Sequence, residues 1–461
     1  MAKSNRQSAI GDRQSSRLVP LLLNWFSANA RDLPWRRTRD PYAVWVSEIM
    51  LQQTQVKTVI PYWERWMREL PTIQAAAKAS PAKIHKLWEG LGYYTRVRNL
   101  QEAAKQIMQS GKRRTNAGKK SEPPHVGCCK FPEIYDDVLA LPGIGRYTAG
   151  AICSIAFNQA VPILDGNVIR VLTRIFGIAE NPKEKKTNAR LWKLAEELVT
   201  TASRHPSVRS SRHKEAQTSM AECGMWNAKD SQNLLTPAAT VAGNCSALNQ
   251  SLMELGALVC TPRNPRCRIC PVKKLCAAFR ENRVEELPDL GRRAAATASR
   301  FVAFVIEQSG RFLVRQRPAG VVNAYLWEFP NAEIGTRLCE PQNADPKANS
   351  LRVTDPRSRA VAEAASKILD VMPKEITPLP TVKHSITRHR ITLEAFHVQL
   401  GGTSYASSHF DAAKSGTRVT RPSEKFSKAG AWKTPAQLQQ LAFPAAHKKI
   451  LHYCLHRRFQ S

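Results

Sequence analysis

Four cysteines in the second half of the chain constrain its fold more than any other feature. Cys260, Cys267, Cys270 and Cys276 lie within 17 residues, in the spacing C-x6-C-x2-C-x5-C. Four thiolates this close together can surround one compact metal centre, and the prolines between them stiffen the loops. Zinc bound by four thiolates is the chemical alternative, although zinc sites usually pair two C-x2-C units and this segment has one. Residues 260–276 are therefore expected to form a metal-binding loop.

The charge balance points to a polyanionic partner. The 461 residues include 69 Lys and Arg against 37 Asp and Glu, a formal net charge of +32. Nucleic acid is the leading candidate, and a basic solvated surface without a specific ligand is the alternative. No apolar run reaches the ~20 residues of a membrane span, and the start lacks the apolar core of a signal peptide. We expect a monomeric protein with no membrane partner, located in the cytoplasm with the nucleoid if the source is bacterial.

Helical patterning dominates the first part of the chain. Residues 18–284 form short amphipathic segments separated by Pro and Gly, with little alternation of period two, which predicts a mainly α domain. Residues 111–130 and 200–243 show no useful periodicity. We expect both to be mobile surface insertions.

The composition changes after the cysteines. Residues 285–299 are typical of a linker, and residues 300–456 are expected to form a smaller α+β domain. The expected elements are a hairpin of residues 301–306 and 311–316, a helix over 360–369 and a strand over 391–398. The fold class is therefore multi-domain.

A candidate general acid lies on the helix expected after Asp40. Asp40 suits an N-cap and Pro41 the first helical position, so Glu48 would share a side with Val44 and Trp45. A carboxyl held among apolar side chains has a raised pKa and can stay protonated near neutral pH, as a general acid for a leaving purine must. Taken alone, the pattern is more typical of a solvent-facing helical glutamate.

The segment LPGIGRYTAG, residues 141–150, predicts a tight turn between two helices. Gly143 and Gly145 permit left-handed backbone and close approach, and Arg146 would open the second helix. Amides at such a helix N-terminus can bind a DNA phosphate without base preference, as in a helix-hairpin-helix. The alternative is a plain Schellman turn.

Two further polar positions are candidates for the same site. Asp165 precedes a helix, and its carboxylate could stabilise the oxocarbenium-like cation that forms when a glycosidic bond breaks. Capping of that helix would by itself account for an aspartate there. Gln52 begins a run of amides suited to insertion into a duplex, although such glutamines are more often solvent-exposed.

Together these residues resemble the adenine DNA glycosylases, the MutY family within the endonuclease III-like superfamily. The resemblance covers residues 21–278 through the motifs LPWR, WVSEIMLQQTQV, LWEGLGYYTRVRNL, LPGIGRYTAG, PILDGNV and LMELGALVCTPRNPRC. It implies a helix-hairpin-helix enzyme of base excision repair whose partner is duplex DNA with adenine opposite 8-oxoguanine or guanine. It also implies that the four cysteines hold a 4Fe-4S cluster.

The resemblance also implies a role for individual residues. The implied catalytic set is Glu48 protonating adenine, Asp165 stabilising the cation, Asn167 orienting the site and Tyr147 assisting the acid. Gln52 and Tyr93 are similar to residues that wedge into the duplex near the oxidised guanine, a role that suits an amide and an aromatic ring.

Position 147 distinguishes two activities. Related glycosylase-lyases have a lysine there, because a lyase needs an amine to form a Schiff base with the sugar, and Tyr147 has none. Ile169 stands where some relatives have another lysine. We therefore expect a monofunctional hydrolase that leaves an abasic site in an uncut strand.

The C-terminal domain resembles the Nudix-like domain of the same family in FVAFVIEQSGRFLVRQRP and YLWEFPNAEI. The Glu-rich helix of Nudix pyrophosphatases does not follow Pro330, so that activity is not expected. Residues 383–389 resemble the loop that contacts 8-oxoguanine, with Ile386, Thr387 and Arg388 in place of Phe-Ser-His. Thr387 retains a hydroxyl for hydrogen bonding.

Two rival functions stay open. A bifunctional pyrimidine glycosylase and AP lyase of the endonuclease III type would share the hairpin and the cluster, although Tyr147 and the extra domain argue against it. A non-catalytic DNA-binding protein would use both features as structural supports. Strand cleavage without alkali would indicate the first rival, and loss of base release on replacing Glu48 would exclude the second.

Overall fold

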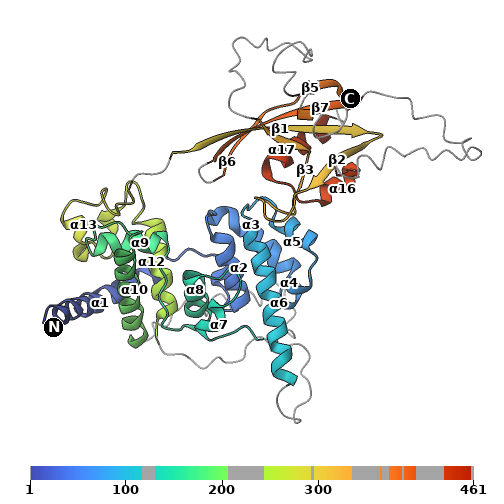
Figure 1. The fold of residues 1–461 in the computed structure, drawn as a ribbon. Helices are drawn as coiled ribbons and strands as arrows, with labels where there is room; N and C mark the ends of the chain where they lie inside the picture. The colour runs from blue at the N-terminus through green and yellow to red at the C-terminus, as the bar shows by residue number, and fades with distance from the viewer. Residues whose placement is uncertain are drawn as a thin grey trace, which may run out of the picture. The chain divides into compact units, whose positions relative to one another are not determined.

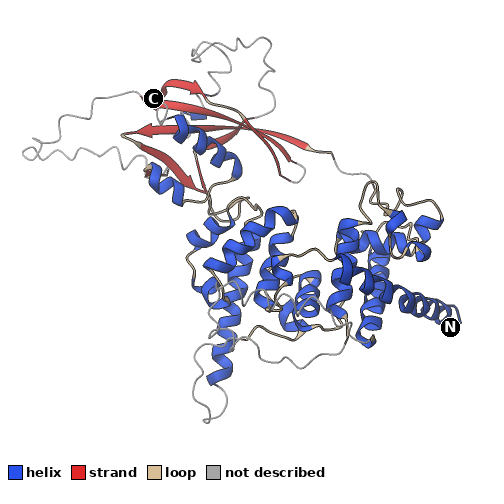
Figure 2. Cartoon of the chain, turned by 180° about the vertical axis from the view of Figure 1, so that it is seen from behind, coloured by secondary structure: helices blue, strands red, loops and turns tan. Residues whose placement is uncertain are grey.

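The computed structural model describes residues 2–116, 130–205, 243–291, 295–334, 361, 364–365, 373–386, 389–400 and 430–457. The packing of the Cα atoms divides the chain into two units, Met1–Lys78 with Arg98–Arg293 and Ala79–Val97 with Ala294–Ser461. The first unit is helical, and all the described strands belong to the second (Figures 1 and 2). The domain boundaries drawn from the sequence stay a prediction, and nothing in the sequence indicated that residues 79–97 pack with the C-terminal unit.

The helical unit is an assembly of short helices. Its elements are α1 (Ala2–Asn29), η1 (Pro34–Arg36), α2 (Pro41–Leu51), α3 (Val56–Glu69), α4 (Ile73–Lys78), most of α6 (Thr95–Asn116), α7 (Tyr135–Leu139), α8 (Arg146–Phe157), α9 (Gly166–Ile175), α10 (Lys185–Arg204), α12 (Cys245–Leu258), η2 (Cys267–Ile269), η3 (Lys273–Leu275) and α13 (Ala277–Arg280). None of the helices in the described part of the chain has the length and apolar character needed to cross a membrane.

Three helix ends differ from the expected positions. The first helix begins at Ala2, well before residue 18, and α6 and α10 continue to Asn116 and Arg204. Both therefore extend past the expected starts of the insertions at residues 111 and 200. The rest of these two stretches, apart from their last residues, lies outside the described part of the chain.

The core of the helical unit forms where α1, α9, α10 and α12 pack together. Leu22, Val171, Leu198 and Leu252, one from each helix, are buried in a single apolar cluster. Burial on α9 and α12 extends beyond these apolar residues, since Arg174 on α9 and Asn249 and Glu254 on α12 are buried as well. This packing fixes α9 and α12 beside each other (Figure 1).

The C-terminal unit is built on a mixed sheet. Its strands are β1 (Thr297–Gln308), β2 (Arg311–Gln316), β3 (Trp327–Glu328), β4 (Asn331–Ile334), β5 (Pro373–Pro378), β6 (Val382–Ile386), β7 (His389–Leu400) and β8 (Ala431–Lys433). The main order is β3-β2-β1-β7-β5, with β1 and β7 parallel and the other pairs antiparallel. The expected hairpin and the expected strand over 391–398 are confirmed. Of the expected helix over 360–369, the structure describes Val361, Ala364 and Ala365, which are helical.

Strand β1 is buried on both faces. Val302, Phe304 and Ile306 pack with Val361 on one side of the sheet. Ala303 and Val305 pack on the other side with the C-terminal helices α16 (Pro435–Gln440) and α17 (Ala445–Arg457). This accounts for the unbroken apolar run FVAFVI, since a strand covered on both faces needs no polar alternation. Residues 79–97 add the helix α5 (Pro81–Trp88) to this unit.

Candidate active site

Glu48 lies on α2, a helix that is covered on all sides. Residues 42–50 are buried, and Glu48 itself is 4% exposed. Asp40 caps the helix by accepting a hydrogen bond from the Tyr42 amide at 3.0 Å, with Pro41 in the first turn, as expected. The helix therefore places the carboxyl inside the protein, which rules out the solvent-facing alternative.

The surroundings of Glu48 raise its pKa into the neutral range. Burial raises the pKa of Glu48 to about 7, because removal from water penalises the charged carboxylate. The Tyr147 hydroxyl donates a 2.7 Å hydrogen bond to Glu48 Oε2, which opposes the rise in pKa, whereas the charge of Asp165 adds to it. A large share of molecules then holds the protonated form that a general acid needs.

Tyr147 is positioned by the turn between α7 and α8. Gly143 has a φ of +75°, and a Cβ at this residue would lie 2.6 Å from the Cβ of Asn99. Gly145 is the N-cap of α8 and Arg146 its first residue, with no side-chain cap on the helix. The expected helix-hairpin-helix turn is confirmed, and backbone conformation and lack of space both require glycine at position 143. The same expectation was wrong for Gly145, which has a φ of −98° and no atom within 4 Å of the place a Cβ would take.

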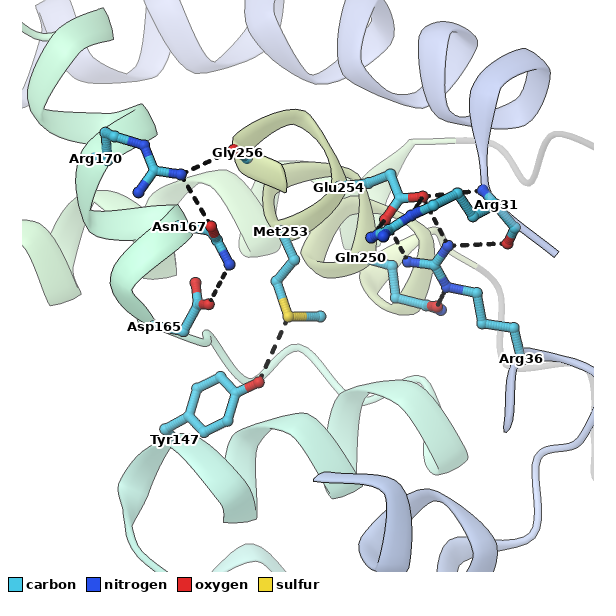
Figure 3. A network of polar contacts seen from close by, with 10 residues as sticks. All are labelled: Arg31, Arg36, Tyr147, Asp165, Asn167, Arg170, Gln250, Met253, Glu254 and Gly256. Carbon is cyan, nitrogen blue, oxygen red and sulfur yellow. Dashed lines mark hydrogen bonds and ion pairs between the residues drawn. The ribbon is translucent and has the colours of Figure 1, made fainter. Parts of the chain in front are cut away.

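Asp165 is held by donors on both carboxylate oxygens. Its Oδ1 accepts from the Val168 amide at 2.7 Å, which caps α9, and its Oδ2 accepts from Asn167 Nδ2 at 2.8 Å (Figure 3). Arg170 Nη2 donates in turn to Asn167 Oδ1 at 2.9 Å. Oδ1 of Asp165 thus caps the helix, and Oδ2 is held by Asn167. Together the two donors fix the orientation of the carboxylate.

The predicted catalytic residues meet in one cavity of about 530 Å³. Glu48, Tyr147, Asp165 and Asn167 all line it. Gln52 lines it from the end of α2, where its Nε2 donates to Thr148 Oγ1 at 3.4 Å. The volume falls within the range of about 300–1,000 Å³ typical of ligand pockets.

Helix α12 contributes a wall to this cavity that was not predicted from the sequence. Gln250, Met253 and Glu254 line it together with Arg36 from η1. Met253 Sδ lies 3.5 Å from the Tyr147 hydroxyl (Figure 3). Residues separated by three or four positions share one face of a helix, so two polar residues at positions 250 and 254 of an apolar helix were the available signal.

Glu254 anchors two arginines at the edge of the cavity. It is 1% exposed, and its Oε2 accepts from Arg31 Nη2 at 2.7 Å and Arg36 Nη2 at 3.0 Å (Figure 3). Burial alone would raise the pKa of Glu254, but the hydrogen bonds from the two guanidinium groups lower it to about 2. Arg36 Nε also donates to Gln250 Oε1 at 3.0 Å. Arg36 belongs to the LPWR motif, to which the sequence analysis gave no role.

Tyr93 and Thr387 are the predicted DNA contacts that belong neither to this cavity nor to the turn before α8. Tyr93 belongs to the C-terminal packing unit, where it is 40% exposed with a φ of +46°. Thr387 lies outside the described residues.

The four clustered cysteines surround a small separate cavity. Cys260, Cys267, Cys270 and Cys276 are free thiols that line it, and Arg174 Nη1 lies 3.4 Å from Cys260 Sγ. Within the described ranges, no group of three or more His, Cys, Asp or Glu side chains has the geometry that a single metal ion needs. Four soft sulfur donors around one space, with a guanidinium beside them, fit an iron-sulfur cluster.

The matches to protein families cover both units. Residues 46–197 match the family described as HhH-GPD superfamily base excision DNA repair protein, and residues 301–453 match the NUDIX domain. The fold and the site therefore define a DNA repair protein of the HhH-GPD superfamily with an appended Nudix-like domain.

Named relatives narrow this class. The chain is 31% identical to the adenine DNA glycosylase of Rattus norvegicus, over 95% of this chain and 78% of that protein. It is 32% identical to the adenine DNA glycosylase of Arabidopsis thaliana, over 86% of this chain and 60% of that protein. It is 33% identical to that of Buchnera aphidicola, over 69% of this chain and 76% of that protein. The chain belongs to the adenine DNA glycosylase family.

Proposed function

We propose that this chain hydrolyses the N-glycosidic bond of adenine mispaired with 8-oxoguanine or guanine in duplex DNA, as a monofunctional enzyme of base excision repair. The observation that carries the proposal is a buried carboxyl, Glu48, whose pKa is about 7 and which lines the same cavity as Asp165. The names of the relatives support adenine as the base that is released.

The chemistry divides between the two carboxyls. Glu48 donates its proton to the departing adenine, so that the base leaves neutral, and the Tyr147 hydroxyl orients the donor. The Asp165 carboxylate, held by Asn167, stabilises the positive charge that develops on the sugar. Water then attacks C1′ and loses a proton to the Glu48 carboxylate, which gives free adenine and an abasic site and restores the acid.

The lining of the cavity supports hydrolysis without strand cleavage. A lyase needs an amine that forms a Schiff base with the sugar. Position 147 carries a phenol, and no lysine lines the cavity among the described residues. Arg36 and Gln250 instead offer hydrogen-bonding groups to the edge of a base.

DNA is the partner, and several groups would hold it. The amides at the start of α8, with Gly143, Gly145 and Arg146, would bind a phosphate. Gln52 and Tyr93 would wedge into the duplex, and Thr387 would contact 8-oxoguanine. The four cysteines would hold a 4Fe-4S cluster, which when bound organises the basic loop 260–276 against the DNA backbone.

A single-turnover assay tests the proposal. Duplexes carry adenine opposite 8-oxoguanine, guanine, thymine or cytosine, and products are separated with and without an alkaline step. We expect adenine release from the first two duplexes, fastest from the first, and a cut strand after alkali alone. Pyrimidine release or cleavage without alkali would establish the lyase instead, and tight binding with no release of any base would establish a non-catalytic binding protein.

A further inference from the structure

Residues 79–97 contribute a buried carboxylate to the C-terminal packing unit. Glu89 follows helix α5 and is 6% exposed. Its Oε2 accepts from Lys448 Nζ at 2.6 Å and from Lys86 Nζ at 3.0 Å, and its Oε1 accepts from the Phe443 amide at 3.0 Å. Three donors on one buried carboxylate fix its position from several directions.

These donors join the segment to the C-terminal helices. Phe443 lies in the connection between α16 and α17, and Lys448 lies on α17. Lys86 Nζ also donates to the Leu441 carbonyl at 3.0 Å, so a second hydrogen bond joins the segment to the end of α16. Burial would raise the pKa of Glu89, but the hydrogen bonds from Lys448 and the Phe443 amide outweigh it and lower the pKa. The carboxylate is therefore charged, and it holds this position only while its donors are in place.

The chain directly after Glu89 is a tight turn. Gly90, Gly92 and Tyr93 have φ values of +109°, +70° and +46°. Two glycines are suited to this backbone, whereas a left-handed tyrosine is uncommon and persists where the surroundings hold it. The turn therefore has a defined shape that starts at Glu89 and ends at the exposed ring of Tyr93.

Two side chains lock this turn from within. Trp88 Nε1 donates to the Gly92 carbonyl at 3.0 Å, and Arg96 Nη2 donates to the same carbonyl at 3.2 Å. The Arg96 guanidinium also stacks on the rings of Trp88 and Tyr93, 5.3 and 5.5 Å from their centroids. Because the turn is rigid, a shift of Glu89 at one end moves Tyr93 at the other.

We propose that Glu89 is a positioning residue that fixes the Tyr93 turn to helices α16 and α17, so that Tyr93 and the C-terminal unit approach the base opposite adenine as one body. This inference rests on the proposed function. It makes the preference for 8-oxoguanine over guanine depend on a side chain directed at the C-terminal helices and not at the DNA.

The test measures single-turnover adenine release opposite 8-oxoguanine and opposite guanine for the full-length protein with its cluster. In Glu89→Gln and Lys448→Met, we expect the ratio of the two rates to fall about tenfold, equivalent to about 1.4 kcal/mol. The double variant should fall no further, because both changes break the same contact. Lys449→Met is the matched control, since Lys449 is exposed on the same helix, and its ratio should equal that of the unmodified protein.

The outcomes separate the two proposals. If the unmodified protein releases no adenine from either duplex, the proposed function fails. If it releases adenine but Glu89→Gln and Lys448→Met keep its ratio, or lower only the melting temperature, Glu89 has a purely structural role and this inference is overturned. Lys448 is 52% exposed, so Lys448→Met decides the question even if Glu89→Gln does not fold.

Discussion

Two walls of one cavity each carry a buried glutamate, and the pKa values of the two are shifted in opposite directions. Glu48 on α2 receives one hydrogen bond from a neutral phenol, and its pKa is about 7. Glu254 on α12 receives hydrogen bonds from two guanidinium groups, and its pKa is about 2. Both side chains are less than 5% exposed. The charge of the donors, and not the degree of burial, therefore decides which carboxyl can give up a proton and which one anchors cations.

The largest effect should follow from removing the acidic proton of the α2 wall. Glu48→Gln keeps the shape of the side chain but cannot donate a proton, so we expect single-turnover adenine release to fall at least about a thousandfold. Binding to the same duplex, measured by gel shift, should survive. Release within tenfold of the unmodified protein would show that Glu48 is not the acid.

The same substitution should stabilise the protein at high pH. The pKa of Glu48 is about 7 in the folded protein and 4.5, its ordinary value, in the unfolded chain. Between these two pH values the unfolded chain binds fewer protons than the folded protein. The free energy of unfolding therefore falls as pH rises through this range. We expect Glu48→Gln to raise the free energy of unfolding by about 3 kcal/mol at pH 8 and by less than about 1 kcal/mol at pH 5. Urea unfolding at both pH values measures this, and an equal gain at both would contradict a raised pKa.

The opposite result is expected on the α12 wall. Glu254→Gln leaves two guanidinium groups without their carboxylate. The unfolding free energy should fall by about 2–3 kcal/mol. This is less than for a fully buried pair, because Arg31 is 34% exposed. Asp32→Asn is the matched control, since Asp32 pairs with Arg37 on the surface and its loss should cost less than about 1 kcal/mol. Equal losses in the two variants would show that burial adds nothing to the Glu254 anchor.

The smallest effect should follow from removing the phenol that donates a hydrogen bond to Glu48. Tyr147→Phe removes a hydrogen bond that lowers the pKa of Glu48, so this pKa should rise further. Base release, which requires the protonated acid, falls as pH increases through the pKa, and the midpoint of that fall should move up by about one unit from its position near 7. A pH profile of the single-turnover rate measures the shift, and an unchanged midpoint would remove Tyr147 from the control of the acid.

Local patterns were sufficient to predict much of this site. Asp40 and Pro41 marked the start of α2, whereas the pattern around Glu48 was compatible with burial but by itself more typical of a solvent-facing glutamate. The glycines of LPGIG predicted the turn before Tyr147. Each of these inferences rests on residues within one turn or one helix, where backbone preferences act directly.

The arginines of Glu254 and the partners of Glu89 could not be inferred in this way. Arg31 and Arg36 reach Glu254 across 223 and 218 residues of chain, and Lys448 reaches Glu89 across 359. Such pairs exist because the packing of distant helices brings them together, and no periodicity records that packing. For the same reason, the packing of residues 79–97 with the C-terminal unit could not be inferred from local patterns.

The proton donor lies on a helix that is buried from Tyr42 to Met50, so its acidity depends on the packing around that helix. The acid works only while water is kept from Glu48, so a molecule that is misfolded or loosened by heat hydrates the carboxyl, and its acidity returns to that of an ordinary glutamate. Local opening around α2 would therefore be sufficient to remove the acid, even where the rest of the fold is intact.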